Sequence, residues 1–383
     1  MDPSIKLLRD LVAIDSVNPS LVPGAAGEGQ IAEAIAVHLR SIGLDVELQE
    51  VVPGRSNVIG VLEGRGRGRS LMLCGHVDTV GVDGMTAPFD PVEREGRLYG
   101  RGSQDMKGGV AAMIDAARHV AQNGGLRAGR LLIAAVVDEE YASLGADALV
   151  TRWRADAAVV TEPTDLQIAI GHKGFAWFEI ETRGRAAHGS RPREGRDAIL
   201  RMGRVLHELE ALDRRLQAAA PHPLMGTASL HASLIEGGRE LSSYPDRCVL
   251  KLERRTVSGE TDADVTREIE RILARLRRAD PEFEASLTLL FGRPSYDLPA
   301  DHALPRALAK ARQEVTVAGA GDSAFVGMSF WTDAAVLGSA GIPSVLFGPG
   351  GAGLHSVEEY VEIDDVLRCR DALAALARGW CGD

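Results

Sequence analysis

The chain has 383 residues, more than a single hydrophobic core usually supports, so two domains are expected. Its 45% hydrophobic and 25% charged residues are typical of a globular protein. The net charge of −11 argues against nucleic acid or an anionic membrane as the main partner, because polyanions would be repelled on average.

Membrane insertion and secretion are not expected either. The apolar run Leu131–Val137 is far too short to span a bilayer, and acidic residues interrupt the apolar residues near the N-terminus, where a signal peptide would lie. The four cysteines are scattered and form no CxxC pair. This pattern is typical of reduced thiols, so we expect a cytoplasmic protein.

The first part of the chain alternates helical patterns with strand-like ones. Apolar residues at helical spacing predict helices around Ile5–Val12 and Ile31–Ile42. The strands predicted after these helices are Val46–Val51, Asn57–Leu62, Leu71–Cys74, Leu131–Val137 and Ala157–Thr161. Between the last three of these strands, helices are predicted from Lys107 and at Tyr141–Trp153. Residues from Thr79 to Gly102 are expected to form a loop. The alternation predicts an α/β domain with a largely parallel sheet and helices on both faces.

The pattern changes at about residue 174. The following elements are predicted: strand Phe175–Thr182, helix Asp197–Leu216, strands Ala228–Ile235 and Arg247–Arg255, a helix capped by Thr261 and Asp264, and strand Ala285–Phe291. This βαββαβ order is that of a ferredoxin-like unit. The α/β pattern then resumes with helices Asp301–Val315 and Thr332–Ser339, strand Pro343–Phe347 and helix Asp364–Arg378. We therefore predict one domain from residues 1–173 and 293–383, with residues 174–292 inserted into it.

Ionisable residues follow several of the predicted strands. His76 and Asp78 come after the first buried strand, and in extended backbone residues two apart point to the same side. Such a carboxylate can hold one ring nitrogen and leave the other free for a metal. The further candidates are Asp105 before a helix, Asp138, Glu139 and Glu140 after the strand Leu131–Val137, Glu162 after Ala157–Thr161, and His355 after FGPGGAG.

Each of these residues taken singly has an ordinary structural explanation, as a helix cap, a solvated acid or a turn histidine. Together, two histidines and several carboxylates at strand ends form the ligand set of a zinc-type site. Converging carboxylates would repel one another, and a pair of divalent cations removes that repulsion.

Five motifs occur in the order and approximate spacing of one known family: GHVDTV, RGSQDMKGG, VVDEEYASLGA, TEPT and GPGGAGLH. Over nearly its whole length the chain resembles the dinuclear zinc metallopeptidases and deacylases, which include acetylornithine deacetylase, succinyl-diaminopimelate desuccinylase, aminoacylase and glutamate carboxypeptidase. The resemblance implies a three-layer α/β/α zinc-binding catalytic domain. It also implies an inserted ferredoxin-like lid through which the protein forms a homodimer.

The resemblance also implies a role for each candidate. Asp105 would bridge two divalent metal ions, zinc first, with cobalt or manganese as alternatives. His76 and Glu162 would complete the shell of one ion, and Glu140 and His355 that of the other. Asp78 would orient His76. Glu139 would be the general base that deprotonates a water held between the metals and later protonates the leaving amine.

Two residues of the inserted domain match the family as well. His188, in RAAHGSRP, corresponds to a lid histidine that stabilises the oxyanion, in dimers from the other subunit. Arg255, in YPDRCVLKLERRT, corresponds to the arginine that holds the substrate carboxylate, and the register favours it over Arg254. Ser242, in SSYP, stands where many relatives have Asn, so the resemblance does not determine the details of substrate contact here.

The expected function is therefore that of a cytoplasmic, metal-dependent amide hydrolase, which removes an acyl group from an N-acyl-amino acid. Glu162 favours this class, because deacylases and carboxypeptidases of the family tend to have Glu at this position. The alternative is a carboxypeptidase or dipeptidase acting on a free C-terminal carboxylate. A remote alternative is a catalytically silent metal-binding homologue, although such a protein would have no reason to retain Glu139 beside a complete ligand set.

Overall fold

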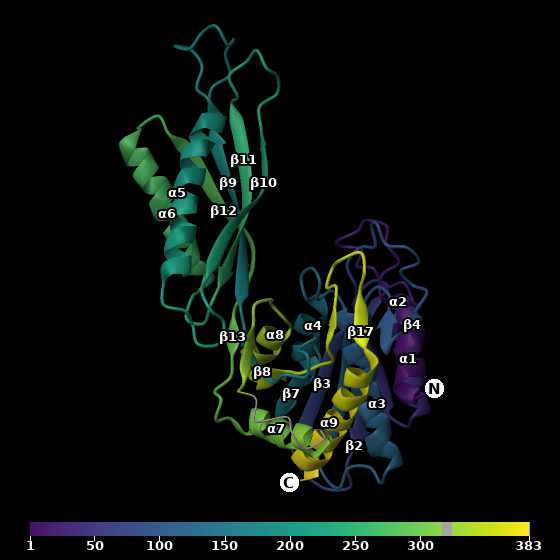
Figure 1. The fold of residues 1–383 in the computed structure, drawn as a ribbon. Helices are drawn as coiled ribbons and strands as arrows, with labels where there is room; N and C mark the ends of the chain where they lie inside the picture. Colours follow the sequence, from purple (N-terminus) through teal and green to yellow (C-terminus); the bar gives the residue numbers. More distant parts are fainter. Residues whose placement is uncertain (316–323, 383) are drawn as a thin grey trace. The chain divides into compact units, whose positions relative to one another are not determined.

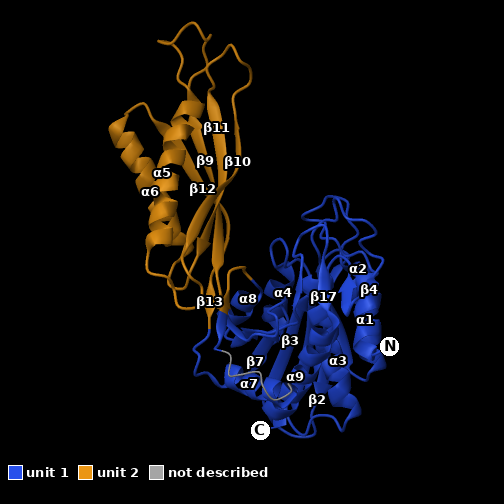
Figure 2. Ribbon diagram, viewed as in Figure 1, with its two compact units in different colours: residues 1–170, 298–326, 332–383 blue, residues 171–297, 327–331 orange. Residues whose placement is uncertain are grey.

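The computed structural model describes residues 1–315 and 324–382, and these residues divide into two compact units (Figure 2). The first unit contains Met1–Ile170, Leu298–Val326 and Thr332–Asp383. The second contains Gly171–Asp297 together with the short segment Gly327–Trp331. The sequence-based boundaries at residues 174 and 292 do not include this short segment, because it is distant in sequence and joins the second unit only through folding.

The first unit is built on a large mixed sheet (Figure 1). Its main strands are β1 (Asp45–Val52), β2 (Arg55–Glu63), β3 (Ser70–His76), β6 (Arg130–Val136), β7 (Ala157–Val160), β8 (Ala169–His172) and β15 (Ser344–Leu346). Their order is β1-β2-β6-β3-β7-β15-β8. The short strands β13 (Tyr296–Asp297) and β14 (Val326–Met328) both pair with β8, and β13 and the end of β8 belong to the residues of the second unit. The consecutive strands β2 and β3 are therefore not neighbours, since β6 lies between them.

The sheet is less parallel than the sequence suggested. Only the central strands β6, β3, β7 and β15 pair in parallel, whereas β1, β2 and β8 pair antiparallel to their neighbours. The physical reason at one edge is the two-residue turn between β1 and β2, in which Gly54 has φ 80°. Strands joined by so short a turn can pair only antiparallel, because a parallel pair needs a long crossover.

Helices pack against this sheet in two groups. The first is α1 (Pro3–Val12), α3 (Gly108–Gln122), α7 (Ala303–Val315) and α9 (Ile363–Gly382), and the second is α2 (Gly29–Ser41), α4 (Leu144–Arg152) and α8 (Ala334–Ser339). Central strands such as β3 are buried along their whole length, as expected for a sheet covered on both faces. The predicted α/β class is confirmed. Among the described residues, no helix combines the length and apolar character needed to cross a membrane.

The stretch predicted as a loop from Thr79 to Gly102 contains two short strands. β4 (Val92–Arg94) and β5 (Arg97–Tyr99) form a small antiparallel sheet with β16 (Gly351–Ala352) and β17 (Tyr360–Glu362). The loop prediction was wrong there, because strands of three residues are too short to show an alternating pattern. This small sheet joins the segment before Asp105 to the segment after His355.

The second unit has the predicted order of elements: β9 (Gly174–Arg183), α5 (Ala198–Ala218), β10 (Ser229–Gly237), β11 (Arg247–Thr256), α6 (Asp262–Ala279) and β12 (Glu284–Arg293). Its antiparallel sheet has the order β10-β11-β9-β12, and α5 and α6 pack on one face (Figure 1). The capping box of Thr261 and Asp264 is present at the start of α6. The core is apolar and includes Phe178, Leu252 and Ile269.

Candidate active site

Three neighbouring parallel strands of the first unit end at one edge of the sheet (Figure 1). His76 is the last residue of β3, Glu139 and Glu140 follow β6, and Glu162 follows β7. Because β3 lies between β6 and β7, the carboxyl ends of these strands bring the four side chains together. Among the described residues, two groups have potential ligand atoms that all lie within 4.8 Å of one another. The first is His76 with Glu139 and Glu162, and the second is His76 with Asp105 and Glu140.

His76 is held at both ring nitrogens. Its Nδ1 lies 3.0 Å from the backbone oxygen of Asp78 and 3.6 Å from the carboxylate Oδ1 of the same residue. Its Nε2 lies 3.1 Å from Asp105 Oδ1 and 3.9 Å from Glu139 Oε2. A proton on Nδ1 that is donated to Asp78 leaves Nε2 with a lone pair directed at the carboxylates, which is the tautomer a metal ligand needs.

Asp105 lies between the two predicted histidine ligands. Its Oδ1 faces His76, whereas its Oδ2 is 3.4 Å from His355 Nε2. His355 Nε2 also lies 3.1 Å from Glu140 Oε2. His355 is the most exposed of these residues, with 54% of its side chain accessible, and its φ of 58° places it in a left-handed turn. Each carboxylate oxygen of Asp105 therefore faces a different histidine.

The turn that carries Asp105 leads directly into α3, and its approach to β7 depends on glycine. A Cβ at Gly109 would lie 1.9 Å from the backbone oxygen of Thr161, the residue before Glu162. No side chain fits at that distance, so the first turn of α3 can reach the end of β7 only with glycine at this position. The Gly108-Gly109 pair therefore explains how Asp105 and Glu162 come into one site.

The electrostatics of the cluster favour additional positive charge. Burial and the neighbouring negative charges raise the pKa of Glu139 and of Glu162 well above the usual range, despite the opposing charge of His76. Burial and the charge of Asp105 raise the pKa of Glu140 as well. Hydrogen bonds to Asp105 and Glu140 raise the pKa of His355 to about 10. A cation would offset the repulsion among these carboxylates, and the N/O donor set suits divalent metal ions such as zinc.

A buried polar network supports the residues around this cluster. The Asp78 carboxylate accepts hydrogen bonds from the backbone N–H groups of Glu139 and Glu140, at 3.1 Å each, and from Asn18 Nδ2 at 2.8 Å. Asn18 Nδ2 also donates to Asp138 Oδ1, and Arg55 Nη2 donates to the same oxygen at 2.8 Å. Asp78 therefore positions the Glu139–Glu140 backbone as well as His76.

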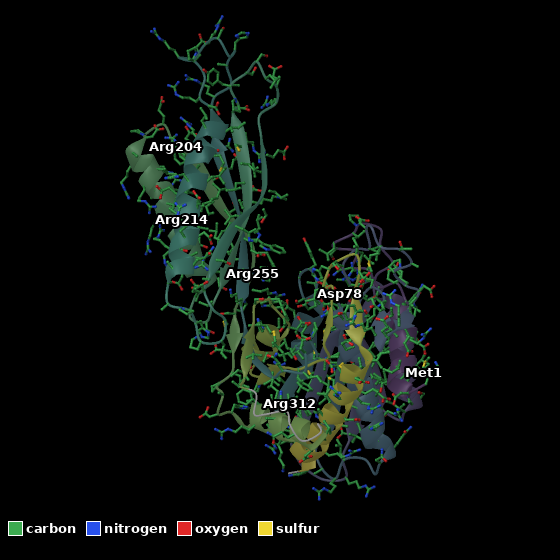
Figure 3. The ribbon with its side chains drawn as sticks, in the orientation of Figure 1. Met1, Asp78, Arg204, Arg214, Arg255 and Arg312 are labelled. Carbon is green, nitrogen blue, oxygen red and sulfur yellow. The ribbon has the colours of Figure 1, made fainter. Side chains whose placement is uncertain are left out.

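His188 and Arg255 belong to the second unit and are described within it. His188 is exposed in the turn between β9 and α5, where its Nδ1 lies 2.8 Å from Ser190 Oγ. Arg255 lies on β11, where 31% of its side chain is accessible and Nε donates to Glu253 Oε1 at 2.7 Å (Figure 3). Arg254, by contrast, is buried and paired with Glu260 and Glu268. The accessible guanidinium at this point of β11 is therefore that of Arg255.

Residues 72–379 match the model of peptidase family M20/M25/M40. This chain belongs to that family. An acetylornithine deacetylase of Myxococcus xanthus is 31% identical, with 98% of this chain and 97% of that protein aligned. A deformylase of N-formyl-4-amino-5-aminomethyl-2-methylpyrimidine from Bacillus subtilis is 29% identical, with 98% and 94% aligned. Membership of the M20 family makes the chain a metal-dependent amide hydrolase.

Several solved structures share the fold. A tripeptidase of Staphylococcus aureus superposes with a TM-score of 0.81 at 19% identity, covering 99% of this chain and 98% of that one. A dinuclear metal-binding M20 peptidase of Bacillus subtilis gives a TM-score of 0.75 at 16% identity, covering 99% and 97%. These matches confirm the predicted fold.

The sequence analysis did not identify several buried residues that lie beside the candidate metal ligands in the structure. Asn18, Glu28 and Arg55 form the buried network beside Asp138, and Arg101 and Glu359 form a buried pair beside the Asp105 turn. Polar and charged residues at these positions give no local pattern that separates them from surface residues. The one available signal was indirect, since Arg101 lies within the motif RGSQDMKGG.

Proposed function

We propose that this enzyme removes the acyl group from an N-acyl-amino acid, as the acetylornithine deacetylases do. The observation that supports this substrate class best is the end-to-end similarity to the Myxococcus xanthus deacetylase. The similarity to a deformylase, which also cleaves an N-acyl bond, favours the same chemistry over peptide cleavage. A carboxypeptidase or dipeptidase is the alternative, since the family also includes peptidases.

Five residues would hold two divalent ions, which we propose to be zinc, with cobalt or manganese as alternatives. His76, Glu162 and Asp105 would form one site, here called the His76 site, and Asp105, Glu140 and His355 the other, called the His355 site. The ions would polarise the amide carbonyl and lower the pKa of the attacking water. The contacts of Asp105 with both histidines support its assignment as the shared ligand.

Glu139 is proposed as the general base. Its backbone is fixed by Asp78, and its side chain is only 10% accessible, so the carboxylate has a defined position at the end of β6. From that position it would take a proton from the attacking water and return it to the leaving amine.

Two residues of the second unit complete the proposal. Arg255 would bind the α-carboxylate of the substrate through two parallel hydrogen bonds, as guanidinium groups do. His188 would donate a hydrogen bond to the oxyanion. If His188 acts across a homodimer formed by the second units, a mixture of His188→Ala and Glu139→Gln proteins should recover part of the activity, because one site of each heterodimer keeps both residues. A mixture with no recovery would contradict the action across subunits.

The cellular location is proposed to be the cytoplasm. The four cysteines, Cys74, Cys248, Cys369 and Cys381, are all free and buried, as is usual in a reducing compartment.

The substrate class can be tested directly with a panel of N-formyl-, N-acetyl- and N-succinyl-amino acids and dipeptides, assayed with added zinc or cobalt. The proposal expects the highest kcat/KM among the N-acyl-amino acids. A higher kcat/KM for dipeptides would assign the chain to the peptidases of the family instead. Release of free amine from each substrate gives one readout for the whole panel.

A further inference from the structure

A buried ion pair lies directly beside the turn that carries Asp105. Arg101 is 3% exposed and Glu359 is 1% exposed, and Arg101 Nη1 donates to Glu359 Oε2 at 2.6 Å. The two residues are 258 positions apart in the chain. Neither is a candidate metal ligand, so their burial in this place calls for another explanation.

Glu359 holds the backbone of the Asp105 turn. Its Oε1 accepts hydrogen bonds from the N–H groups of Gln104 at 2.9 Å and Asp105 at 3.1 Å. Its Oε2 accepts another from the N–H of Gly102 at 3.0 Å, in addition to the bond from Arg101. One carboxylate thus accepts hydrogen bonds from three backbone N–H groups of the turn, including that of Asp105 itself.

Arg101 also donates hydrogen bonds to the backbone of two further loops. Its Nη2 donates to the backbone oxygen of Ser356 at 3.0 Å, next to His355, and its Nε donates to the backbone oxygen of Gly81 at 3.2 Å, shortly after Asp78. The guanidinium group is planar and rigid, so these bonds fix the loops of Gly81 and Ser356 relative to the loop that contains Arg101. A lysine ammonium has no such fork and could not keep all three contacts.

The position of His355 makes this connection important. His76 and Glu162 lie at or next to the ends of buried, hydrogen-bonded strands, which hold their backbones in place. His355 instead lies in an exposed turn that no strand of the large sheet supports. The contact of Arg101 with Ser356 ties that turn to the turn of Asp105.

We propose that Arg101 and Glu359 are positioning residues, which hold His355 and Asp105 in the arrangement that the His355 site requires. The inference rests on the proposed function, because it assumes that these two residues bind a metal ion. It predicts an asymmetric effect. Loss of the pair should weaken the His355 site, whereas the His76 site, whose other ligands are held by the sheet, should be much less affected.

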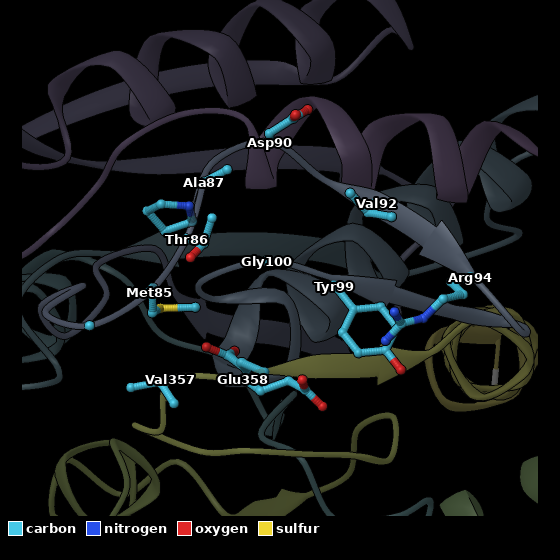
Figure 4. A pocket seen from close by; sticks show the side chains of 13 residues that line it. Met85, Thr86, Ala87, Asp90, Val92, Arg94, Tyr99, Gly100, Val357 and Glu358 are labelled. Carbon is cyan, nitrogen blue, oxygen red and sulfur yellow. The ribbon is translucent and has the colours of Figure 1, made fainter.

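The deciding variant is Arg101→Lys, which keeps a positive charge beside Glu359 but removes the fork. Glu359→Gln, which removes the charge and part of the acceptor capacity, is the second variant. The matched control is Glu358→Gln, one position away. Glu358 is exposed and lines a cavity of about 350 Å³ that Met85, Thr86 and Tyr99 also line (Figure 4).

The full-length chain is first treated with a chelator and then titrated with Co²⁺. Calorimetry and the visible absorption of bound cobalt monitor the binding. A His355→Ala protein gives the signal of the His76 site alone and so assigns the two binding steps. We expect wild type and Glu358→Gln to bind two ions. Arg101→Lys should bind the His355-site ion about 10- to 100-fold more weakly, as is usual when an outer partner of a metal ligand is lost, and the other step should be much less affected.

Glu359→Gln should weaken the His355 step at least as much, and circular dichroism should show a folded chain for both variants. Unchanged binding in Arg101→Lys, or equal weakening of both steps, would overturn the inference and leave a merely structural ion pair. If the wild-type chain bound no Co²⁺, the proposed function would fail and the inference with it. The comparison of variants with wild type therefore separates the two failures.

Discussion

His76 and His355 each contact one oxygen of the same carboxylate. His76 Nε2 lies 3.1 Å from Asp105 Oδ1, and His355 Nε2 lies 3.4 Å from Asp105 Oδ2. A carboxylate that presents its two oxygens to two separate imidazoles is suited to a pair of cations, because each oxygen can serve one ion. This relationship makes Asp105 the residue on which both proposed metal sites depend.

Replacement of Asp105 by Ala should therefore remove both ions, in contrast to His355→Ala, which should remove one. We expect metal content near zero for Asp105→Ala after desalting in dilute metal, against about two ions per chain in wild type. Elemental analysis of the purified proteins measures this. Asp90→Asn, an exposed carboxylate in the same half of the chain, is the control. Full metal content in Asp105→Ala would exclude the bridging role.

Glu139→Gln should abolish turnover while leaving the metal content at the wild-type level. A general base contributes to proton transfer, so its loss lowers kcat by about 10²- to 10⁴-fold. The distances alone would also allow Glu139 to be a ligand, since it lies in one group with His76 and Glu162. Kinetics and metal analysis on the same preparation distinguish the two roles. A variant that loses one ion together with its activity would identify Glu139 as a ligand.

Arg255→Lys should reduce the preference of the enzyme for substrates with a free α-carboxylate. Lysine keeps the charge but cannot form the two parallel hydrogen bonds of a guanidinium. The measurement is the ratio of kcat/KM for an N-acyl-amino acid to kcat/KM for its amide. Arg247→Lys, at the other end of β11 and paired with Glu181, is the matched control. An unchanged ratio in Arg255→Lys would mean that Arg255 serves only its contact with Glu253.

Arg55→Ala should destabilise the first unit strongly. Arg55 donates two hydrogen bonds to Glu28 and one to Asp138, and both carboxylates are fully buried. Removal of the cation leaves two buried charges without their partner, which costs about 3–5 kcal/mol in the free energy of unfolding. Arg152→Ala removes an exposed pair with Glu47 and should cost about 0–1 kcal/mol. Denaturant unfolding of the two variants should show this difference, and equal losses would contradict it.

The stability of the protein should fall below neutral pH partly because of His172. This residue is fully buried, and burial lowers its pKa from about 6.5 to about 4. The unfolded chain therefore binds a proton more readily than the folded chain, so the stabilising effect is complete above pH 6.5 and is lost as the pH falls toward 4. The full difference is of the order of 3 kcal/mol.

His172→Gln should remove this part of the pH dependence. The measurement is the free energy of unfolding of wild type and variant between pH 4 and pH 7, with the exposed His207→Gln as control. The candidate metal ligands are the same in all three proteins, so the comparison cancels any contribution they make to the pH dependence. Parallel curves for wild type and His172→Gln would show that His172 does not contribute.

The sequence alone determined the elements that carry a clear local pattern. The buried strand before His76, the helix that begins near Lys107 and the capping box of Thr261 and Asp264 were all predicted, since each depends on neighbouring residues in the chain. The βαββαβ order of the second unit was predicted for the same reason. Short strands such as β4 and β5 were missed because three residues show no period.

Only the tertiary structure decided how those pieces meet. β6 lies between β2 and β3, although no local pattern distinguishes that order from a hairpin, and this order places Glu139 and Glu140 beside His76. The approach of His355 to Asp105, and the pairing of Arg101 with Glu359, join segments far apart in the chain. Such contacts depend on the packing of the whole unit, because a buried charge without a partner is costly in free energy. A local pattern in the sequence therefore cannot predict them.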